Sequence, residues 1–385
     1  MQSAGYPRIA IVGSGLGGLA CARVLQAHGV SVSVFEREPE GGARPQRGSV
    51  QLRADLGQAA LAAARLTDRF RASCRPAGRE LRVFDPFTAA LLHHDPPPDR
   101  PGPESAEGSA EGWAEEQNAV IDRGRLRALL LDSLDVRTVS WRHFVVDVTE
   151  RSGGRWRLHF SDGRREDYDL VIGADGAWSR VRALLCRATP GYTGVMSVEA
   201  GCDAVDTRHV DLAWLVGAGT LVARDTDRVL LAQRDGGGSV GLHAVFRAPE
   251  SWWISCGLAA RNQAVLRSQL LEVFDGWDER LLYALRKSDG VLVVRPVYAL
   301  PGPPAWRHVS GVTLVGEAAH PIQPFDRGAD LALRDGADLA RAVLAAVAGD
   351  DTAVLVYEYE MRSRAASAAE GAARRLRALM TSPVP

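Results

Sequence analysis

Apolar side chains near the start of the chain first follow the pattern of a strand and then that of a helix. Residues 8–13 form a short apolar run that stops at glycine, and apolar side chains then recur at helical spacing as far as Leu25. A second strand pattern, VSVSVF, follows over residues 30–35. This order predicts a strand–helix–strand unit. Further runs at 169–173 and 311–316 also end at glycine, which is typical of buried parallel strands.

The middle of the chain has a different pattern, and it predicts a second lobe. Within residues 191–294, alternating segments separated by Asp and Gly turns indicate antiparallel strands. Residues 330–347 and 351–380 are rich in Ala, Leu, Arg and Glu, which favours helices. Residues 95–112 are rich in Pro, Gly, Ser and Glu and predict a mobile surface loop.

Composition narrows the classes of partner. The 385 residues carry a formal net charge of −1, which gives no basic field for nucleic acid or anionic lipid. No apolar run is long enough to cross a membrane. The five cysteines form neither a zinc motif nor a disulfide framework, so we expect no metal and a cytoplasmic location. The expected partners are small molecules, and the expected state is a monomer or weak homodimer.

The glycines after the first strand carry the clearest chemical signal. Gly13, Gly15 and Gly18 fit the pattern G-x-G-x-x-G between a strand and a helix, with Ser14 and Leu16 inside it. Such a turn brings the main chain close to a pyrophosphate at a helix N-terminus. Glu36 ends the second strand, where an acid accepts hydrogen bonds from ribose hydroxyls. The alternative is a glycine-rich turn with a surface glutamate, and the motif does not separate NAD from FAD.

Longer segments resemble one family. These are VSVFER from Val32, VIDRGRLRALL from Val120, DLVIGADGAWSRVR from Asp169 and VGEAAHPIQPF from Val315. Their residues and order resemble the single-component (class A) FAD-dependent monooxygenases and aromatic hydroxylases. Three further stretches, beginning at Gly48, Phe274 and Tyr357, resemble the tetracycline-destroying branch.

The resemblance implies an α/β fold in three parts. A Rossmann-type FAD-binding domain with a three-layer ββα arrangement would comprise residues 1–75, 113–190 and 295–348. An inserted, mainly antiparallel β-sheet substrate domain would comprise residues 76–112 and 191–294, and residues 349–385 would form a C-terminal helix. It also implies FAD as cofactor, with NADPH or NADH as a transient co-substrate.

The resemblance assigns the chemistry to the flavin and no catalytic side chain to the protein. The residues that it places at the cofactor are Gly13, Ser14, Gly15, Leu16, Gly18, Glu36, Arg37, Arg44, Arg123, Asp175, Glu317, Gly328, Ala329 and Asp330. It places Glu199 and Thr220 at the substrate. Arg123 could equally be a solvated helix residue, and Asp175 could simply form a turn. We interpret His320 as a packed structural residue.

Some positions depart from the family. Glu317 stands where the family has an aspartate, and Asp330 where it usually has an asparagine near the flavin. Asp330 could place a charge against reduced flavin, or it could cap a helix and point away. Gln51 replaces a flavin-side aspartate. We therefore expect oxidation of a hydrophobic polycyclic or aromatic natural product other than tetracycline. The alternatives are a structural flavin in an enzyme of non-redox cyclisation or rearrangement, and a binding protein that has lost FAD.

Overall fold

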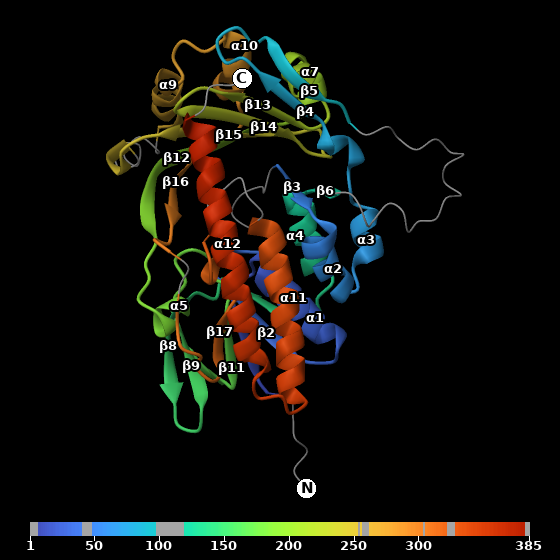
Figure 1. The fold of residues 1–385 in the computed structure, drawn as a ribbon, viewed down its shortest axis with the longest axis vertical. Helices are drawn as coiled ribbons and strands as arrows, with labels where there is room; N and C mark the ends of the chain where they lie inside the picture. The colour runs from blue at the N-terminus through green and yellow to red at the C-terminus, as the bar shows by residue number, and fades with distance from the viewer. Residues whose placement is uncertain are drawn as a thin grey trace, which may run out of the picture.

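Two sheets, one parallel and one mainly antiparallel, organise the molecule along its long axis (Figure 1). The computed structural model describes residues 7–40, 48–97, 119–252, 255, 262–302, 305–321 and 328–381. The first sheet has five parallel strands in the order β17-β11-β1-β2-β7. Its strands are β1 (Ile9–Val12), β2 (Val32–Glu36), β7 (Val139–Trp141), β11 (Leu170–Gly173) and β17 (Val312–Leu314).

The parallel sheet is the middle of three layers. One face carries an antiparallel sheet of β8 (Val145–Arg151), β9 (Arg155–Phe160) and β10 (Arg165–Tyr168). Trp156, Leu158 and Phe160 alternate along β9 and are buried in the core shared with the parallel sheet. The other face is covered by α1 (Leu16–Ala27) and α11 (Gly328–Val347). These layers confirm the ββα arrangement expected from the sequence.

The second sheet has seven strands in the order β16-β12-β15-β14-β13-β4-β5. They are β4 (Leu81–Phe84), β5 (Leu91–Asp95), β12 (Gly191–Cys202), β13 (Thr220–Arg224), β14 (Arg228–Arg234), β15 (Val240–Arg247) and β16 (Val293–Ala299). All neighbours are antiparallel except β4 and β13. The predicted antiparallel sheet is therefore confirmed, and residues before 97 add two strands to it.

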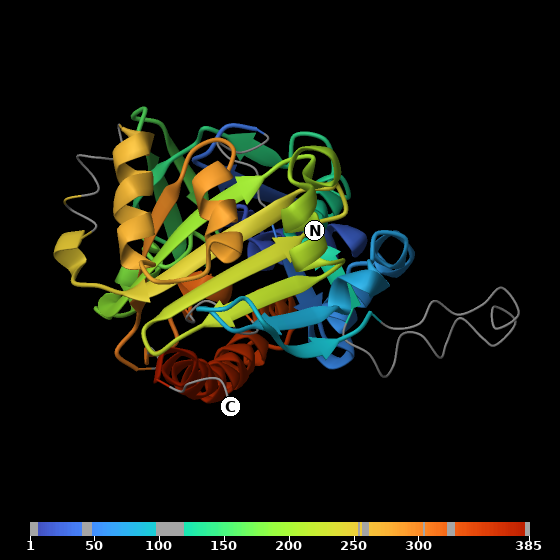
Figure 2. The ribbon, with the colours of Figure 1, turned by 90° about the horizontal axis from the view of Figure 1, so that it is seen from above.

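Helices cover the outer face of the seven-stranded sheet (Figure 2). They are α7 (Val210–Val216), α9 (Gln263–Val273) and α10 (Glu279–Lys287). The Asn262 and Asp278 side chains cap α9 and α10 by accepting hydrogen bonds from main-chain N–H groups of the first turn. Buried leucines on all three helices pack against the sheet and form a second core.

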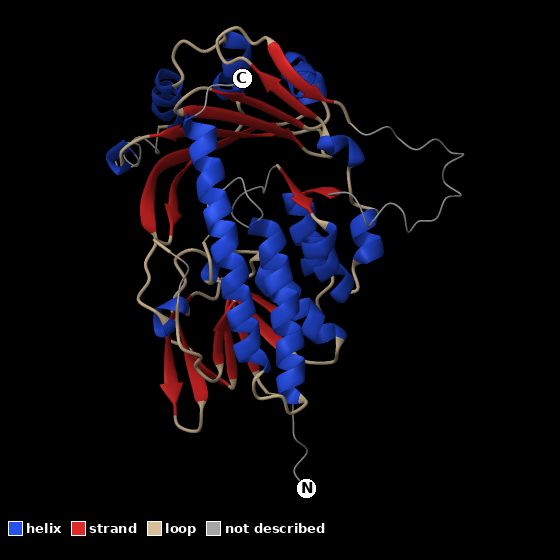
Figure 3. Ribbon diagram, viewed as in Figure 1, coloured by secondary structure: helices blue, strands red, loops and turns tan. Residues whose placement is uncertain are grey.

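The C-terminal helix α12 (Ala353–Thr381) connects the two halves (Figure 3). It packs beside α11 at its start, and its far end lies under the inner face of the seven-stranded sheet. There Leu376 packs against Val195, Val229, Val245 and Val297. The Arg224 guanidinium donates a hydrogen bond of 3.2 Å to the carbonyl oxygen of Ala378. The predicted helices at 330–347 and 351–380 thus correspond to α11 and α12.

Shorter elements complete the chain. The strands β3 (Ser49–Leu52) and β6 (Ala119–Asp122) pair as an antiparallel ribbon between the two sheets. The remaining short helices are η1 (Ala54–Gln58), α2 (Ala59–Ala63), α3 (Thr67–Arg71), η2 (Pro76–Arg79), α4 (Arg123–Leu131), α5 (Arg182–Leu185), α6 (Val205–Arg208) and η4 (Gly316–Ala318). In the described part of the chain, no helix has the length and apolarity of a membrane span. Arg44 and residues 98–112 of the expected loop lie outside the described residues.

Candidate cofactor and substrate site

The turn between β1 and α1 is shaped by glycines. Gly13 has a φ of +99°, and a methyl group there would lie 2.4 Å from the carbonyl oxygen of Ala174. A methyl group at Gly18 would lie 2.8 Å from the Cβ of Ala174. Gly15 is the N-cap of α1, whose first turn receives no hydrogen bond from a capping side chain. The turn therefore presents free N–H groups at a helix N-terminus, beginning with Leu16.

Glu36 lies beside this turn and is held by main-chain and side-chain donors. Its Oε2 accepts hydrogen bonds from the Ser14 main-chain N–H at 2.8 Å and the Ser14 hydroxyl at 2.6 Å. Its Oε1 accepts one from the N–H of Glu38 at 2.9 Å. Burial opposes ionisation, but these hydrogen bonds prevail and lower the pKa of Glu36. The site therefore contains a fixed carboxylate at the carboxyl end of β2.

Arg127 on α4 is a member of this site that we did not predict from the sequence. Its Nη2 donates a hydrogen bond of 2.8 Å to the Ser14 hydroxyl, and its guanidinium lies 5.6 Å from the centre of the Trp141 ring. The available signal was its spacing of four residues from Arg123, which places both on one face of a helix.

Asp175 and Glu317 follow the carboxyl ends of β11 and β17; β11 pairs with β1, and β17 pairs with β11. Asp175 accepts hydrogen bonds from the Ser179 hydroxyl at 2.5 Å and the Arg180 N–H at 2.7 Å, so it stabilises its own turn. Burial raises the pKa of Asp175. A methyl group at Gly176 would lie 3.9 Å from Oε2 of Glu317, which places the exposed Glu317 opposite this turn. Both acids therefore border the same sheet edge as Gly13 and Glu36.

The expected arginines lie along the same side. Arg37 follows Glu36 and is exposed. Arg123 begins α4, and its N–H donates to the carbonyl oxygen of Gly48 at 3.0 Å while its side chain is exposed. Arg123 thus lies one helical turn before Arg127 on α4.

Asp330 has a role that the sequence did not indicate. It is the third residue of α11, after Gly328 and Ala329, so it does not occupy the N-cap of that helix. Its carboxylate is buried and accepts hydrogen bonds from the N–H groups of Arg53 at 3.1 Å and Gly57 at 3.0 Å. Burial raises the pKa of Asp330 to about 6, although these two N–H groups oppose the shift. Asp330 thereby attaches η1 to the first turn of α11.

The inner face of the seven-stranded sheet carries both expected substrate residues. Glu199 is paired with His243 across β12 and β15, and Thr220 with Gln233 across β13 and β14. Directly paired residues share a face, so the strand register places all four on one face. Glu199 forms an ion pair of 2.5 Å with Arg295. Burial lowers the pKa of His243, and Glu199 acts in the opposite direction.

This face is divided into a polar and an apolar half. The valines that pack against Leu376 of α12 form the apolar half, and the residues around Glu199 form the polar half. Gly48, at the start of β3, lies against the polar half, because a methyl group there would be 2.9 Å from Oε1 of Gln233. The face is thus brought close to the ribbon of β3 and β6.

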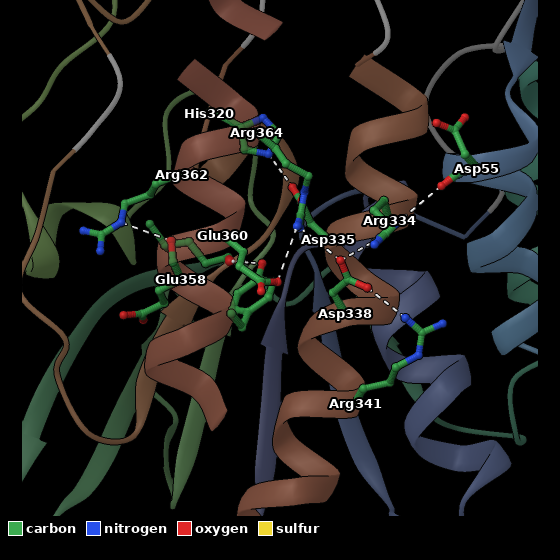
Figure 4. A network of polar contacts seen from close by, with 12 residues as sticks. Asp55, His320, Arg334, Asp335, Asp338, Arg341, Glu358, Glu360, Arg362 and Arg364 are labelled. Atoms are coloured by element: carbon green, nitrogen blue, oxygen red, sulfur yellow. Dashed lines mark hydrogen bonds and ion pairs between the residues drawn. The ribbon is translucent and has the colours of Figure 1, made fainter. Parts of the chain in front are cut away.

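His320 belongs to a buried network (Figure 4). His320 and Asp335 form a short hydrogen-bonded ion pair through Nε2 and Oδ2, and both are buried. Burial opposes protonation, but Asp335 prevails and raises the pKa of His320. Arg364 of α12 contacts Asp335 at 3.3 Å and Asp338 at 3.1 Å. The structure therefore shows His320 as a packed residue held by Asp335 of α11, while Arg364 joins α11 to α12.

The edge fits a dinucleotide cofactor. Free N–H groups at the start of α1 can bind the phosphates, and Glu36 can accept a hydrogen bond from a ribose hydroxyl. A side chain on Gly13 would clash with the main chain of Ala174, so this tight turn requires glycine. Among the described residues, no group of His, Cys, Asp and Glu could hold a metal ion. The side chains around the turn therefore suit binding and orientation of an organic cofactor.

Comparisons with known proteins agree with this geometry. The NAD(P)-binding Rossmann-like domain family matches residues 11–65. The chain is 29% identical to Monooxygenase asqM of Emericella nidulans over 86% of this chain and 83% of that protein. A variant of HpxO from Klebsiella pneumoniae, solved with FAD, superposes with a TM-score of 0.76 at 18% identity, over 96% of this chain and 89% of that one. The tetracycline destructase Tet(51) superposes with a TM-score of 0.70 at 18% identity, over 98% and 92%.

Fold, cofactor type and relatives thus agree with the family expected from the sequence. The glycine turn with Glu36 lies in the matched Rossmann-like region, and the curated relative spans both sheets. The chain is thus similar to FAD-dependent monooxygenases in sequence and shares the fold of solved FAD-binding proteins.

Proposed function

We propose that this chain is an FAD-dependent monooxygenase that uses NAD(P)H and O2 to oxidise a hydrophobic polycyclic or aromatic natural product. In the balanced reaction, the substrate takes up one oxygen atom of O2 and the other leaves as water. NAD(P)H supplies two electrons as a hydride and becomes NAD(P)+, and one proton from solvent completes the water. The observation that carries the proposal is that Glu199 and Thr220 share the face of the seven-stranded sheet whose Gln233 lies against Gly48, next to the ribbon of β3 and β6.

The cofactor residues act by binding and orientation. FAD, when bound, supplies the redox chemistry and activates O2. The N-terminus of α1 would bind the pyrophosphate through Gly15 and Leu16, while Glu36 would bind the adenosine ribose. Arg37, Arg44 and Arg123 would add positive charge on the phosphate side. Asp175, Glu317 and the first turn of α11, with Gly328, Ala329 and Asp330, would border the rest of the cofactor.

The substrate residues would orient the ring system that is oxidised. Glu199 is held by Arg295, so it can accept a hydrogen bond from a substrate hydroxyl without rotating. Thr220 lies on the same face, on β13, and its hydroxyl can donate or accept a hydrogen bond there. The valine cluster that packs against Leu376 of α12 limits water at the other end of the face. A fused-ring substrate with hydroxyl groups at one end matches this division.

The proposal is tested by supplying a panel of phenols and fused-ring polyketides with NADPH or NADH under labelled oxygen (18O2). We expect substrate-dependent NAD(P)H consumption and a product that gains one labelled oxygen atom. Glu199→Ala should raise KM for that substrate about tenfold through loss of a charge-assisted hydrogen bond. Glu150→Ala on the exposed β8 is the matched control and should leave KM unchanged. Unlabelled product formed without NAD(P)H would favour a non-redox rearrangement instead.

A further inference from the structure

A chain of hydrogen bonds runs from Arg127 through Ser14 to Glu36. Arg127 Nη2 donates to the Ser14 hydroxyl at 2.8 Å, and this hydroxyl lies 2.6 Å from Glu36 Oε2. Arginine is a donor only, so the Ser14 oxygen must accept from it. The hydroxyl hydrogen is therefore directed at Glu36. Ser14 is buried, which keeps water from competing for this arrangement.

The donors on Glu36 leave a specific place for a ligand. A carboxylate has about four acceptor positions. Ser14 takes both positions on Oε2 through its N–H and hydroxyl, and the N–H of Glu38 takes one on Oε1. These donors from the described residues leave one acceptor position, on Oε1. That position can accept a hydrogen bond from a ribose hydroxyl.

The position of Arg127 is itself fixed. It lies on α4, with its guanidinium over the Trp141 ring at the end of β7. Because β7 pairs with β2, the ring is anchored to the strand that carries Glu36; Trp141 and Glu36 are directly paired. The guanidinium therefore approaches Ser14 from a rigid support.

We propose that Arg127 is a positioning residue for the cofactor, because it fixes the Ser14 hydroxyl and thereby presents Oε1 of Glu36 to the adenosine ribose of FAD. A carboxylate that is already oriented loses less conformational freedom when it binds. Arg127 thus acts on the affinity for the adenosine half of FAD without touching the reacting ring. This inference rests on FAD binding along the edge described above.

The test is a titration of FAD into the apoprotein of the full chain, followed by flavin fluorescence. Arg127→Met should weaken FAD binding about tenfold, and Arg127→Lys should recover most of that loss because it keeps a charged donor. Ser14→Ala should produce a similar loss, and the double variant should lose little more than Ser14→Ala alone. Arg125→Met, an exposed residue on the same helix, is the matched control and should bind FAD normally.

An FAD analogue built on 2′,3′-dideoxyadenosine identifies the group that is positioned. The wild-type chain should bind this analogue more weakly than FAD, and Arg127→Met should then add less than a twofold loss. Equal losses for FAD and the analogue would overturn the inference, since they would indicate direct contact with the phosphates. Wild-type affinity in Arg127→Met would overturn it too. Failure of the wild-type chain to bind FAD would instead contradict the proposed function.

Discussion

The carboxylate of Asp330 accepts a hydrogen bond of 3.0 Å from the main-chain N–H of Gly57, 273 residues away in the sequence. A methyl group at Gly57 would lie 2.5 Å from the same carboxylate oxygen, so the two residues fit only because one is glycine. The contact joins η1, which follows β3, to the first turn of α11. It therefore fixes two segments that border the proposed flavin site.

The buried carboxylate of Asp330 makes stability depend on pH. Its pKa rises from 3.8 to about 6 on folding, so the native chain holds a proton that the unfolded chain releases between these values. Stability from this residue is therefore lost as the pH rises through that window. Asp330→Asn keeps an oxygen acceptor and removes the charge. We expect it to stabilise the protein by about 1–3 kcal/mol at pH 8 and by little at pH 4, as measured by urea unfolding.

Asp351→Asn is the control, because Asp351 is an exposed acid outside this contact. Its stability should follow the wild type at both pH values. A destabilised Asp330→Asn at pH 8 would mean that the charge strengthens the bonds to Arg53 and Gly57 by more than its burial costs.

Helices α1 and α11 approach closely at two glycines. A methyl group at Gly336 would lie 2.2 Å from the carbonyl oxygen of Gly17, which is main chain and cannot move aside alone. We expect Gly336→Ala to destabilise the fold by about 2–4 kcal/mol in thermal unfolding. Gly371→Ala on α12, where the nearest atom is a flexible arginine end at 3.4 Å, should instead stabilise by about 0.5–1 kcal/mol. Similar changes in thermal stability for Gly336→Ala and Gly371→Ala would refute the close packing of α1 against α11.

The network of Figure 4 combines buried and exposed charges. Asp335 is buried and pairs with both His320 and Arg364, so Asp335→Asn leaves buried His320 without its carboxylate and removes one of the two carboxylates close to Arg364. The expected loss is about 3 kcal/mol of unfolding free energy in urea. Glu360→Gln removes an exposed charge that lies 3.9 Å from the same Arg364 and should cost less than about 0.5 kcal/mol. An unchanged free energy of unfolding in Asp335→Asn would show that the Asp335–Arg364 pair does not hold α12.

Local patterns in the sequence predicted the helices and strands well, because buried apolar side chains recur with the period of each element. The apolar runs that end at glycine became β1, β11 and β17, and the alternating segments became the seven-stranded sheet. The glycine turn with Glu36 was also predictable, since its residues lie within one strand–helix–strand unit. The resemblance supplied the order of the two lobes.

Long-range polar contacts were not predictable from the pattern. The partners of Asp330 lie more than 270 residues earlier, and no period in the sequence joins them. Arg127 reaches Ser14 over 113 residues, and only its helical spacing from Arg123 was visible. The network that holds α12 likewise depends on where α11 and α12 meet. Such contacts follow from tertiary packing and not from local propensity.

Glu36 should contribute directly to affinity for FAD. Glu36→Ala removes the acceptor for the adenosine ribose and should weaken binding by about 1–3 kcal/mol in an equilibrium titration. Glu40→Ala, an exposed acid nearby, should bind normally. An unchanged dissociation constant in Glu36→Ala would place the adenosine elsewhere.

The most direct measurement of the central claim is the visible spectrum of the purified chain, recorded before and after anaerobic addition of NADPH or NADH in the presence of candidate substrates. We expect about one FAD per chain, a spectrum that bleaches on reduction, and a colourless Gly15→Val variant, because a side chain there would hold the main chain away from the pyrophosphate. A wild-type chain without flavin, a flavin that neither nucleotide reduces, or a Gly15→Val variant with full flavin content would contradict it.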